Sequence, residues 1–497
     1  MQRWYRLAVL TLLVLSGAEV TKSWAQSAAI DRQAELERRL GALEQKLNQL
    51  EKRVDAALPN GAAPQTTVPE DRLDALDKKL QLIEKNNQEN AKKVPVVTAG
   101  RDGFAITSAD KNYRLKIGGY AQVDGKTFYE DRAHKLTNSF GLTRVRLNID
   151  GRIGKFIEFR MAPDFGNNTF RLFDAYVDLK YQPYAILRGG KFKTPFGLEM
   201  LQPDTDLSLI ERSLASDLVP NRDVGFQVSG NVAGRFTYQA AILNGTMDSA
   251  SSEIDVNDGK EVVGRIFASP FAKSGPNFLQ GLGFGLAAST GRQNGTTTTS
   301  NAVVSVSTAA LPSFKSSGAQ AVFFSYNSNA FAAGRRLRYS PQMYYYNGPF
   351  GLLAEYVESN QDVAAVVSNR VVAPREISNH AWQVAGSWVL TGEKKSYNGL
   401  LPRRPLEGGI TKPGFGAWEI AGRYSELNVD PTVFTANLAD STKSARAARA
   451  WTVGLSWYLN KNARISLNYE QAHFQGGAAG GNRPAEKTFG QRLQIVF

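Results

Sequence analysis

The chain of 497 residues has no cysteine and only three histidines, His134, His380 and His473. These histidines lie far apart and have no ligand spacing, and no Gly-rich phosphate loop precedes a predicted helix. Asp204 and Asp206 form a loop carboxylate pair, which is the one hint of a hydrolase or a Ca²⁺ site. We therefore expect no enzyme activity, no metal and no cofactor.

Long hydrophobic runs are also missing from the body of the chain. No run of about 18 apolar residues follows the N-terminus, which excludes a transporter built from membrane-spanning helices. The first 25 residues combine Arg3 and Arg6, the apolar run Leu7–Leu15 and a small-x-small site ending at Ala25. This pattern is typical of a signal peptide, with an uncleaved anchor as the alternative. An exported chain without disulfides needs another source of stability, and a closed β-barrel would supply it.

Positive charge exceeds negative charge, with 59 Lys and Arg against 46 Asp and Glu and a formal net charge of +13. Such a balance favours anionic partners. An exported protein rarely meets nucleic acid, so we expect no nucleic acid. Anionic solutes and anionic lipid headgroups remain as partners.

Residues 26–94 carry a narrow leucine stripe with the 4,3 spacing of a coiled coil, interrupted by a Pro-containing linker at 59–69. The stripe consists of Leu36, Leu40, Leu43, Leu47, Leu50 and Val54, and it resumes at Leu73, Leu76, Leu80 and Ile83. Self-association, with a homotrimer preferred, is the favoured interpretation. An amphipathic helix on the surface of the same chain is the alternative.

From residue 113 onward the sequence changes to period-2 alternation broken by Gly, Asn, Asp and Pro. Val145 and Leu147 share one face of such a segment, while Arg144 and Arg146 share the other. Similar segments occur around Val177, Ile420 and Leu467. The alternation predicts β-strands, and it fits a soluble sandwich as well as a membrane barrel.

Three further features favour the membrane barrel. Aromatic residues cluster at strand ends, as at Tyr344–Tyr346 and Trp457–Tyr458. The chain ends on Phe497, which lies on the apolar parity of the last strand and is expected to close the barrel against the first. Short turns at Gly151–Gly154 and Asn460–Asn462 alternate with long polar loops at Asn244–Lys260, Arg292–Ser317 and Thr391–Lys412.

The 385 residues from 113 to 497 accommodate on the order of 16 strands, at about 24 residues for each strand with its connection. The expected fold is therefore all-β: a transmembrane antiparallel barrel of about 16 strands, preceded by an α-helical coiled coil. The expected domains are a signal peptide (1–25), a periplasmic coiled coil (26–94), a linker (95–112) and an outer-membrane barrel (113–497).

Several blocks of the barrel region resemble the phosphate-selective porin O and P family. They include YRLKIGGYAQVD from Tyr113, LTRVRLNIDG from Leu142, FDAYVDLKY from Phe173, LRGGKFKTPFGLE from Leu187, WTVGLSWYLN from Trp451 and the terminal RLQIVF. The resemblance implies a 16-stranded outer-membrane barrel that assembles as a trimer. It also implies an inward-folding third extracellular loop and rows of arginine and lysine that conduct phosphate or polyphosphate.

The resemblance also implies roles for individual residues of this chain. Arg144 falls at the place of a constriction arginine, but Thr143 stands where the family has a second one. Asp174 matches the acidic residue of the family's FD-A segment. The loop after Glu199, extending to Arg212, corresponds to the inward-folding loop, and Met200 stands there in place of a lysine.

An anion-selective pore needs fixed cations that replace part of the hydration of the anion. Arg144 and Arg146 would place two guanidinium groups about 7 Å apart on one strand. Lys191 and Lys193 share the parity of Leu187, so the alternation does not decide whether these two lysines face the lumen or the outside. The predicted anion-binding residues are Arg144, Arg146, Arg160, Lys180, Lys191, Lys193, Arg423 and Arg464, with Asp174, Glu199 and Arg212 at the constriction and its loop.

An alternative is that these cations brace the barrel wall by pairing across strands with carboxylates. The candidate partners are Asp150, Glu158, Asp174, Asp178, Glu419 and Glu470. A further cluster, Arg335, Arg336 and Arg338, lies near a predicted loop. It is expected to hold lipopolysaccharide phosphates, to attract anions to the mouth, or to be solvated.

The sequence thus predicts an outer-membrane porin that passes small anions such as phosphate or polyphosphate by diffusion. A general, weakly selective porin is one alternative. A mainly structural outer-membrane tether is the other, in which the periplasmic coiled coil would bind peptidoglycan.

Overall fold

The computed structural model describes residues 94–100, 103–129, 136–255, 257–406 and 414–497, with isolated residues between 45 and 85. The expected signal peptide and almost all of the expected coiled coil lie outside these described residues. The chain divides into two compact units, 1–87 and 88–497. The second unit holds the strands.

Sixteen strands of the described chain form one closed antiparallel barrel, because each strand pairs with its neighbours and the last pairs with the first. This confirms the strand number expected from the sequence. The barrel strands are β3 (Tyr113–Tyr129), β4 (Ser139–Ile153), β5 (Ile157–Asp164), β6 (Arg171–Gln182), β7 (Ala185–Lys193), β8 (Arg222–Val232), β9 (Phe236–Leu243), β10 (Glu261–Ala268), β11 (Leu282–Asn294), β16 (Ala330–Asn347), β17 (Phe350–Val367), β18 (Arg370–Val389), β19 (Ala417–Asn428), β20 (Ala445–Tyr458), β21 (Ala463–Ala478) and β23 (Glu486–Val496).

The barrel closes at the C-terminal residue, as the sequence predicts. The backbone N–H of Gly119 donates to the carbonyl of Phe497 at 2.8 Å, and the N–H of Phe497 donates to the carbonyl of Gly119 at 2.9 Å. The Phe497 side chain stays exposed on the outer surface. A chain that ends inside a strand therefore leaves no free edge at this seam.

The period-2 pattern sorts side chains between lipid and lumen as predicted. On β6, Val177 and Leu179 are exposed on the outside, while Asp178 is buried on the inside. On β19, Ile420 is exposed and Arg423 is buried. The inner face is therefore polar and charged, as in outer-membrane barrels.

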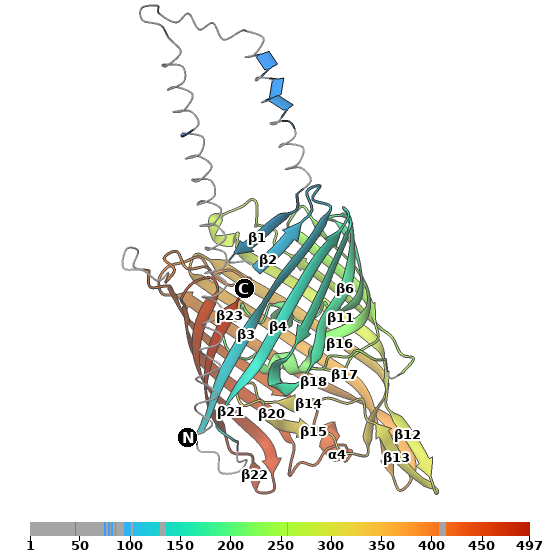
Figure 1. Cartoon of the computed structure of the whole chain (residues 1–497). Helices are drawn as coiled ribbons and strands as arrows, with labels where there is room; N and C mark the ends of the chain where they lie inside the picture. The colour runs from blue at the N-terminus through green and yellow to red at the C-terminus, as the bar shows by residue number, and fades with distance from the viewer. Residues whose placement is uncertain are drawn as a thin grey trace, which may run out of the picture. The chain divides into compact units, whose positions relative to one another are not determined.

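The two ends of the barrel differ (Figure 1). The short turns 154–156, 183–184, 348–349 and 459–462 lie at one end together with Phe497; we call this the turn end. The opposite, loop end carries the longer connections, including β12 to β15. The expectation that Thr391–Lys412 lies on the side of the long loops was wrong, because its described residues, 391–406, follow β18 at the turn end. The length of a connection therefore does not by itself show on which side of the membrane the connection lies.

The expected linker 95–112 contains two strands, β1 (Val96–Gly100) and β2 (Gly103–Thr107). Phe104 and Ile106 of β2 alternate with the buried Ala105, and β2 pairs with the start of β3. The remaining elements are η1 (Gly166–Asn168), α3 (Leu198–Leu201), η2 (Leu214–Leu218), η3 (Asn277–Leu279), β12 (Thr296–Ser300), β13 (Val303–Thr308), β14 (Ser313–Lys315), β15 (Val322–Ser325), α4 (Thr432–Thr435) and β22 (Gly481–Asn482).

Gly190 lies in β7 directly before Lys191, and the alternation left the face of Lys191 and Lys193 undecided. Its φ is +128°, a conformation that residues with a side chain rarely adopt. A Cβ at this position would meet the carbonyl oxygen of Ala175 at 2.2 Å. Lys193 lines one cavity and Lys191 lines another, although Leu187 on the same nominal parity is exposed outside.

We expect Gly190→Ala to lower the free energy of unfolding by about 2 kcal/mol or more, because it adds a steric clash to a strained φ. Gly386→Ala is the matched control, since a Cβ there would meet nothing within 4 Å. Unfolding in denaturant in detergent micelles measures both. Equal stability of the two variants would contradict this account of β7.

Candidate functional site: the lumenal constriction

The segment 194–221, which joins β7 to β8, folds into the lumen and contacts the opposite wall. The N–H of Leu198 donates to Glu355 of β17 at 2.7 Å, and the Ser208 hydroxyl donates to Glu419 of β19 at 2.9 Å. We call this segment the inner loop. It contains the Glu199–Arg212 stretch that the resemblance assigned to the constriction.

Asp204 of the inner loop meets two of the predicted cations. Its Oδ2 accepts from Arg146 Nη1 at 2.9 Å and from the Tyr120 hydroxyl at 2.9 Å, and its Oδ1 accepts from Arg212 Nη1 at 2.5 Å. Burial alone would raise the pKa of this carboxyl, but the nearby cations, led by Arg212 and Arg144, hold the pKa well below its usual value. Asp204 is therefore ionised.

Arg146 is occupied further by Asp164, which accepts from its Nε at 2.9 Å and lies 2.9 Å from its Nη2. Arg144 is placed differently. It donates to Gln122 at 2.9 Å and lies 3.6 Å from Glu211 of the inner loop. The two arginines predicted to act together thus have separate partners.

Glu211 is a second carboxylate of the inner loop that gathers cations. Lys126 lies 3.3 Å away, Arg144 3.6 Å and Arg492 3.9 Å. Burial would raise the pKa of Glu211, but these three cations lower it to about 2. Its charge is therefore present at every physiological pH.

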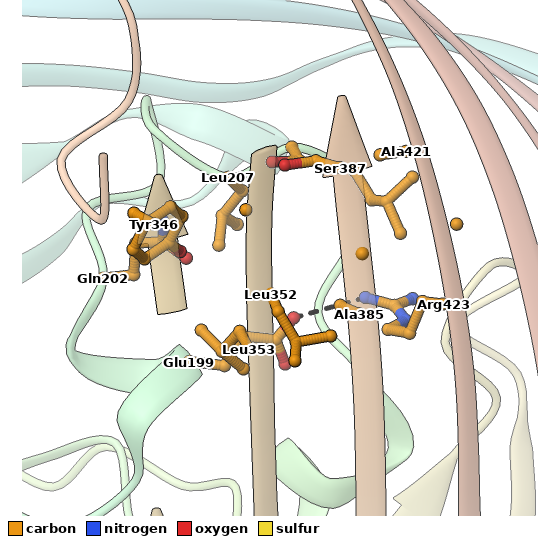
Figure 2. Close-up of a pocket in the computed structure, with 15 residues that line it drawn as sticks. Glu199, Gln202, Leu207, Tyr346, Leu352, Leu353, Ala385, Ser387, Ala421 and Arg423 are labelled. Atoms are coloured by element: carbon orange, nitrogen blue, oxygen red, sulfur yellow. Dashed lines mark hydrogen bonds and ion pairs between the residues drawn. The ribbon is translucent and has the colours of Figure 1, made fainter. Parts of the chain in front are cut away.

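Glu199 ties the inner loop to itself and to the far wall. Its Oε2 accepts from Ser213 and Ser216, and its Oε1 lies 3.3 Å from Arg423 of β19. Figure 2 shows this ion pair beside a pocket between the loop and strands β17 to β19. The pocket volume is only about 40 Å³, which is room for little more than ordered water.

Two other predicted cations hold the backbone of the inner loop. Lys193 Nζ donates to the carbonyls of Met200 and Gln202, both at 2.8 Å. Arg464 Nη1 donates to the carbonyl of Leu207 at 2.8 Å. Neither has a carboxylate partner among the described ion pairs, so both act as clamps on the loop.

The remaining predicted residues form ion pairs, as the bracing alternative expects. Arg160 lies 3.0 Å from Asp150, Lys180 2.5 Å from Glu158, Lys191 2.8 Å from Glu253, and Asp174 2.8 Å from Arg222. All six carboxylates named as candidate partners pair with a cation, but several cations differ from those expected.

Arg188 and Arg222 were missed by sequence reasoning. Arg188 donates from Nε and Nη2 to Asp178, at 2.7 and 2.9 Å. Arg222 is the first residue of β8, and its guanidinium lies over the Phe173 ring. Arg188 could have been found from its alternation with the outward Leu187. Arg222 follows the inner loop directly, and no alternating residue precedes it.

The cluster Arg335, Arg336 and Arg338 is divided between the two faces of β16. Arg335 is exposed and lies 3.3 Å from Glu376. Arg336 and Arg338 are buried in the lumen, where both pair with Glu261. A solvated or lipid-binding cluster is therefore wrong for these two, because the residue alternation turns them inward.

Apolar side chains fill the lumen next to the inner loop on the side of β17 to β21. Leu214 and Leu218 of η2 pack in one cluster with Phe314 and Phe324 of β14 and β15 and with Val357 of the inner wall. These side chains are fully or almost fully buried. These side chains therefore occupy the part of the lumen in which they pack.

Open space lies along the opposite wall, from β3 to β9. One cavity of about 390 Å³ is lined by five cations and two carboxylates, namely Arg146, Arg160, Arg188, Lys193, Arg222, Asp174 and Asp204. A second cavity of about 650 Å³ lies by the loop-end residues Arg171, Lys191 and Glu253. Phe173 and Asn221, in the second cavity, directly precede Asp174 and Arg222 in the first, so the two follow the same wall.

The model of the phosphate-selective porin O and P family matches residues 115–497. The chain belongs to this family. The match begins two residues into β3 and ends at Phe497, so it covers the whole barrel. The described chain is accordingly the barrel of an outer-membrane porin.

Individual relatives agree with the family assignment. The chain is 23% identical to Porin O of Pseudomonas aeruginosa over 444 residues, which are 81% of this chain and 92% of that protein. It is 24% identical to an uncharacterized protein of Caulobacter vibrioides over 535 aligned positions, covering 99% and 96% of the two chains.

Solved porins are more distant. The outer membrane channel DcaP of Acinetobacter baumannii is 11% identical with a TM-score of 0.49, covering 80% of this chain and 99% of that one. An anion-selective porin from Comamonas acidovorans is 12% identical with a TM-score of 0.45, covering 78% and 100%.

Asp217 of η2 gives the contact between the inner loop and β14 a dependence on pH. Its Oδ2 accepts from the N–H of Lys315 at 2.7 Å, and burial raises its pKa to about 7. In the unfolded chain the pKa is about 3.9. The folded state therefore binds a proton that the unfolded state releases, and stability rises as the pH falls from 7 toward 4.

We expect Asp217→Asn to stabilise the protein by on the order of 2 kcal/mol at pH 8 and to have almost no effect at pH 4. Asparagine keeps the acceptor for Lys315 and removes the charge. Unfolding free energies at the two pH values test this. A stabilisation that is the same at both would show that the carboxyl does not titrate in this range.

Proposed function

We propose that the chain is a passive diffusion channel of the outer membrane with a modest preference for small anions. The observation that carries this proposal is the cavity of about 390 Å³ beside the inner loop, where five cationic side chains face two carboxylates. Small hydrated ions fit such a space. The family assignment to phosphate-selective porins supports the same direction of selectivity.

The ion pairs at the wall leave part of each cation available to a permeant. A guanidinium group has five N–H donors in a planar fork. Arg188 spends the donors of Nε and Nη2 on Asp178, so those of Nη1 lie outside these bonds. An anion passing along β6 to β8 can therefore exchange water for charge-assisted hydrogen bonds.

The preference is modest because most of the positive charge is compensated. Asp150, Asp164, Asp174 and Asp178 each lie beside an arginine of the cavity. Thr143 stands where the family has a second arginine, and it is the extra residue of a bulge in β4. A channel with these features passes small anions without a dedicated phosphate filter.

We expect Arg222→Gln to lower the ratio of anion to cation permeability by about threefold, equivalent to about 0.7 kcal/mol. The change removes a cation from the cavity and leaves Asp174 without this partner. Single-channel reversal potentials in planar bilayers under a KCl gradient measure the ratio. Arg449→Gln is the control, because Arg449 also pairs with a carboxylate, Glu426, but is exposed.

A wild-type channel that prefers potassium over chloride would contradict the proposed anion preference. So would an unchanged permeability ratio in Arg222→Gln. A shift of equal size in the control would assign the effect to net charge instead of to the cavity.

We further propose that the chain is exported with 1–25 as its signal peptide and that 26–94 form a periplasmic coiled coil joining three copies. The leucine stripe of 26–94 supports this, and the linker 59–69 divides it. On this proposal the barrel, from 113 on, conducts by itself. A tether to peptidoglycan is the alternative use of the coil.

Deletion of residues 26–93 separates these roles. The shortened protein should still conduct with unchanged selectivity after insertion into bilayers, and its trimers should dissociate at a lower temperature. Loss of conductance in correctly inserted protein would contradict the independence of the barrel. Unchanged trimer stability would assign the coil to another partner.

A further inference from the structure

The Asp204 carboxylate lies where three donors from separate parts of the chain meet. Tyr120 belongs to β3, Arg146 to β4 and Arg212 to the inner loop, and each contacts an oxygen of Asp204 within 2.9 Å. The carboxylate also lines the open cavity of about 390 Å³. It is therefore beside the path proposed for anions.

The two arginine donors are held in place without Asp204. Two nitrogens of Arg146 contact Asp164, and its guanidinium lies 3.9 Å from the centre of the Phe173 ring. Arg212 donates to the carbonyl of Gln202 at 2.9 Å and to that of Glu199 at 3.3 Å. Both guanidinium groups are therefore preorganised by other contacts.

Such a set matches a free oxyanion as well as a side-chain carboxylate. Two guanidinium groups and a hydroxyl that converge on two oxygens form the arrangement by which proteins bind carboxylate and phosphate groups. A permeant anion that reached these donors unopposed would be held by several charge-assisted bonds. Tight holding slows conduction, because each site must also release the ion.

We propose that Asp204 is a tethered anion that occupies the oxyanion-binding position of the constriction and prevents permeant carboxylates or phosphate from being captured there. The inference rests on the proposed function in that small anions must reach the constriction. It makes Asp204 the residue that distinguishes a weakly selective channel from an oxyanion-binding one.

The bonds and charges of Asp204 support this role. Both carboxylate oxygens are engaged, and the surrounding cations keep the pKa low enough that the carboxyl does not lose its charge by taking up a proton. Its attachment to the inner loop sets its concentration at the site, so a free anion must compete with an intramolecular ligand. Removal of the carboxylate leaves both guanidinium groups in place and opens the site.

The test compares Asp204→Asn and Asp204→Gly with Asp206→Asn. Asp206 lies two residues along the same loop, accepts from the Thr205 hydroxyl at 3.3 Å and has no ion pair among the described residues. Asp206→Asn therefore makes the same charge change without opening the site. Single-channel current is recorded in KCl while formate, acetate or phosphate is added.

We expect formate and phosphate to block the current of both Asp204 variants at concentrations at least tenfold lower than in the wild type. The Asp206→Asn channel should resemble the wild type. If the Asp204 variants and the wild type are blocked at the same concentrations, the proposal is wrong. The wild-type reversal potential is read in the same experiment, so a failure of anion preference is seen separately from a failure of this inference.

A second readout in detergent micelles does not require conduction. Formate fits the space left by Asp204→Gly and should raise the unfolding temperature of this variant by several degrees. The wild type and Asp206→Asn should show no such shift. If Asp204 only braces the inner loop, formate will leave the stability of Asp204→Gly unchanged, which would overturn the proposal.

Discussion

Each charged side chain that the barrel turns inward is separated from lipid by a single layer of backbone, and a buried ion without a partner is costly there. The lumen meets this constraint by supplying partners from loops as well as from strands. Arg146 is matched by Asp204, Arg423 by Glu199, and Arg492 by Glu211 and by Asp124 of β3. The inner loop is therefore part of the charge balance of the wall, and its position follows from that balance.

This arrangement divides the lumen into two unlike halves. Along β17 to β21 the inner loop is fixed by ion pairs and covered by the aromatic cluster of β14 and β15. From the turn end, the segment that follows β18 also reaches the loop, where the Tyr397 hydroxyl donates to the carbonyl of Leu198 at 2.6 Å. The open half lies along β3 to β9, where the two cavities lie and where five cationic side chains line one of them.

The sequence was sufficient to predict the strands and their faces, because period-2 alternation is a local property. Val177 and Asp178 were sorted correctly from their neighbours alone. The sequence was insufficient to predict the partners of the cations, because these partners come from distant positions in the chain. The bond between Leu198 and Glu355 spans 157 residues and that between Leu207 and Arg464 spans 257.

Local irregularities of the backbone also could not be predicted from the period-2 alternation. Gly190 has a φ of +128° inside β7, and the bulge at Thr143 removes that residue from the ladder. The connection after β18 is long but begins at the turn end. The length of a connection therefore did not predict at which end of the barrel it lies. The residue types in the sequence predicted where cationic side chains would lie. Only the folded inner loop shows which of these cations already have a carboxylate partner.

We infer that solutes pass along β3 to β9 and that this path favours anions. The chain has no cysteine, so single cysteines report without background. Asn148→Cys places a thiol in the open cavity, and Ala385→Cys places one in the small pocket behind the inner loop. Each is treated with methanethiosulfonates of similar size that carry a sulfonate or a trimethylammonium group, and current block is timed. We expect rapid block of Asn148→Cys, faster with the sulfonate, and little reaction of Ala385→Cys. Faster reaction of Ala385→Cys, or a preference of Asn148→Cys for the cationic reagent, would contradict the passage of anions along β3 to β9.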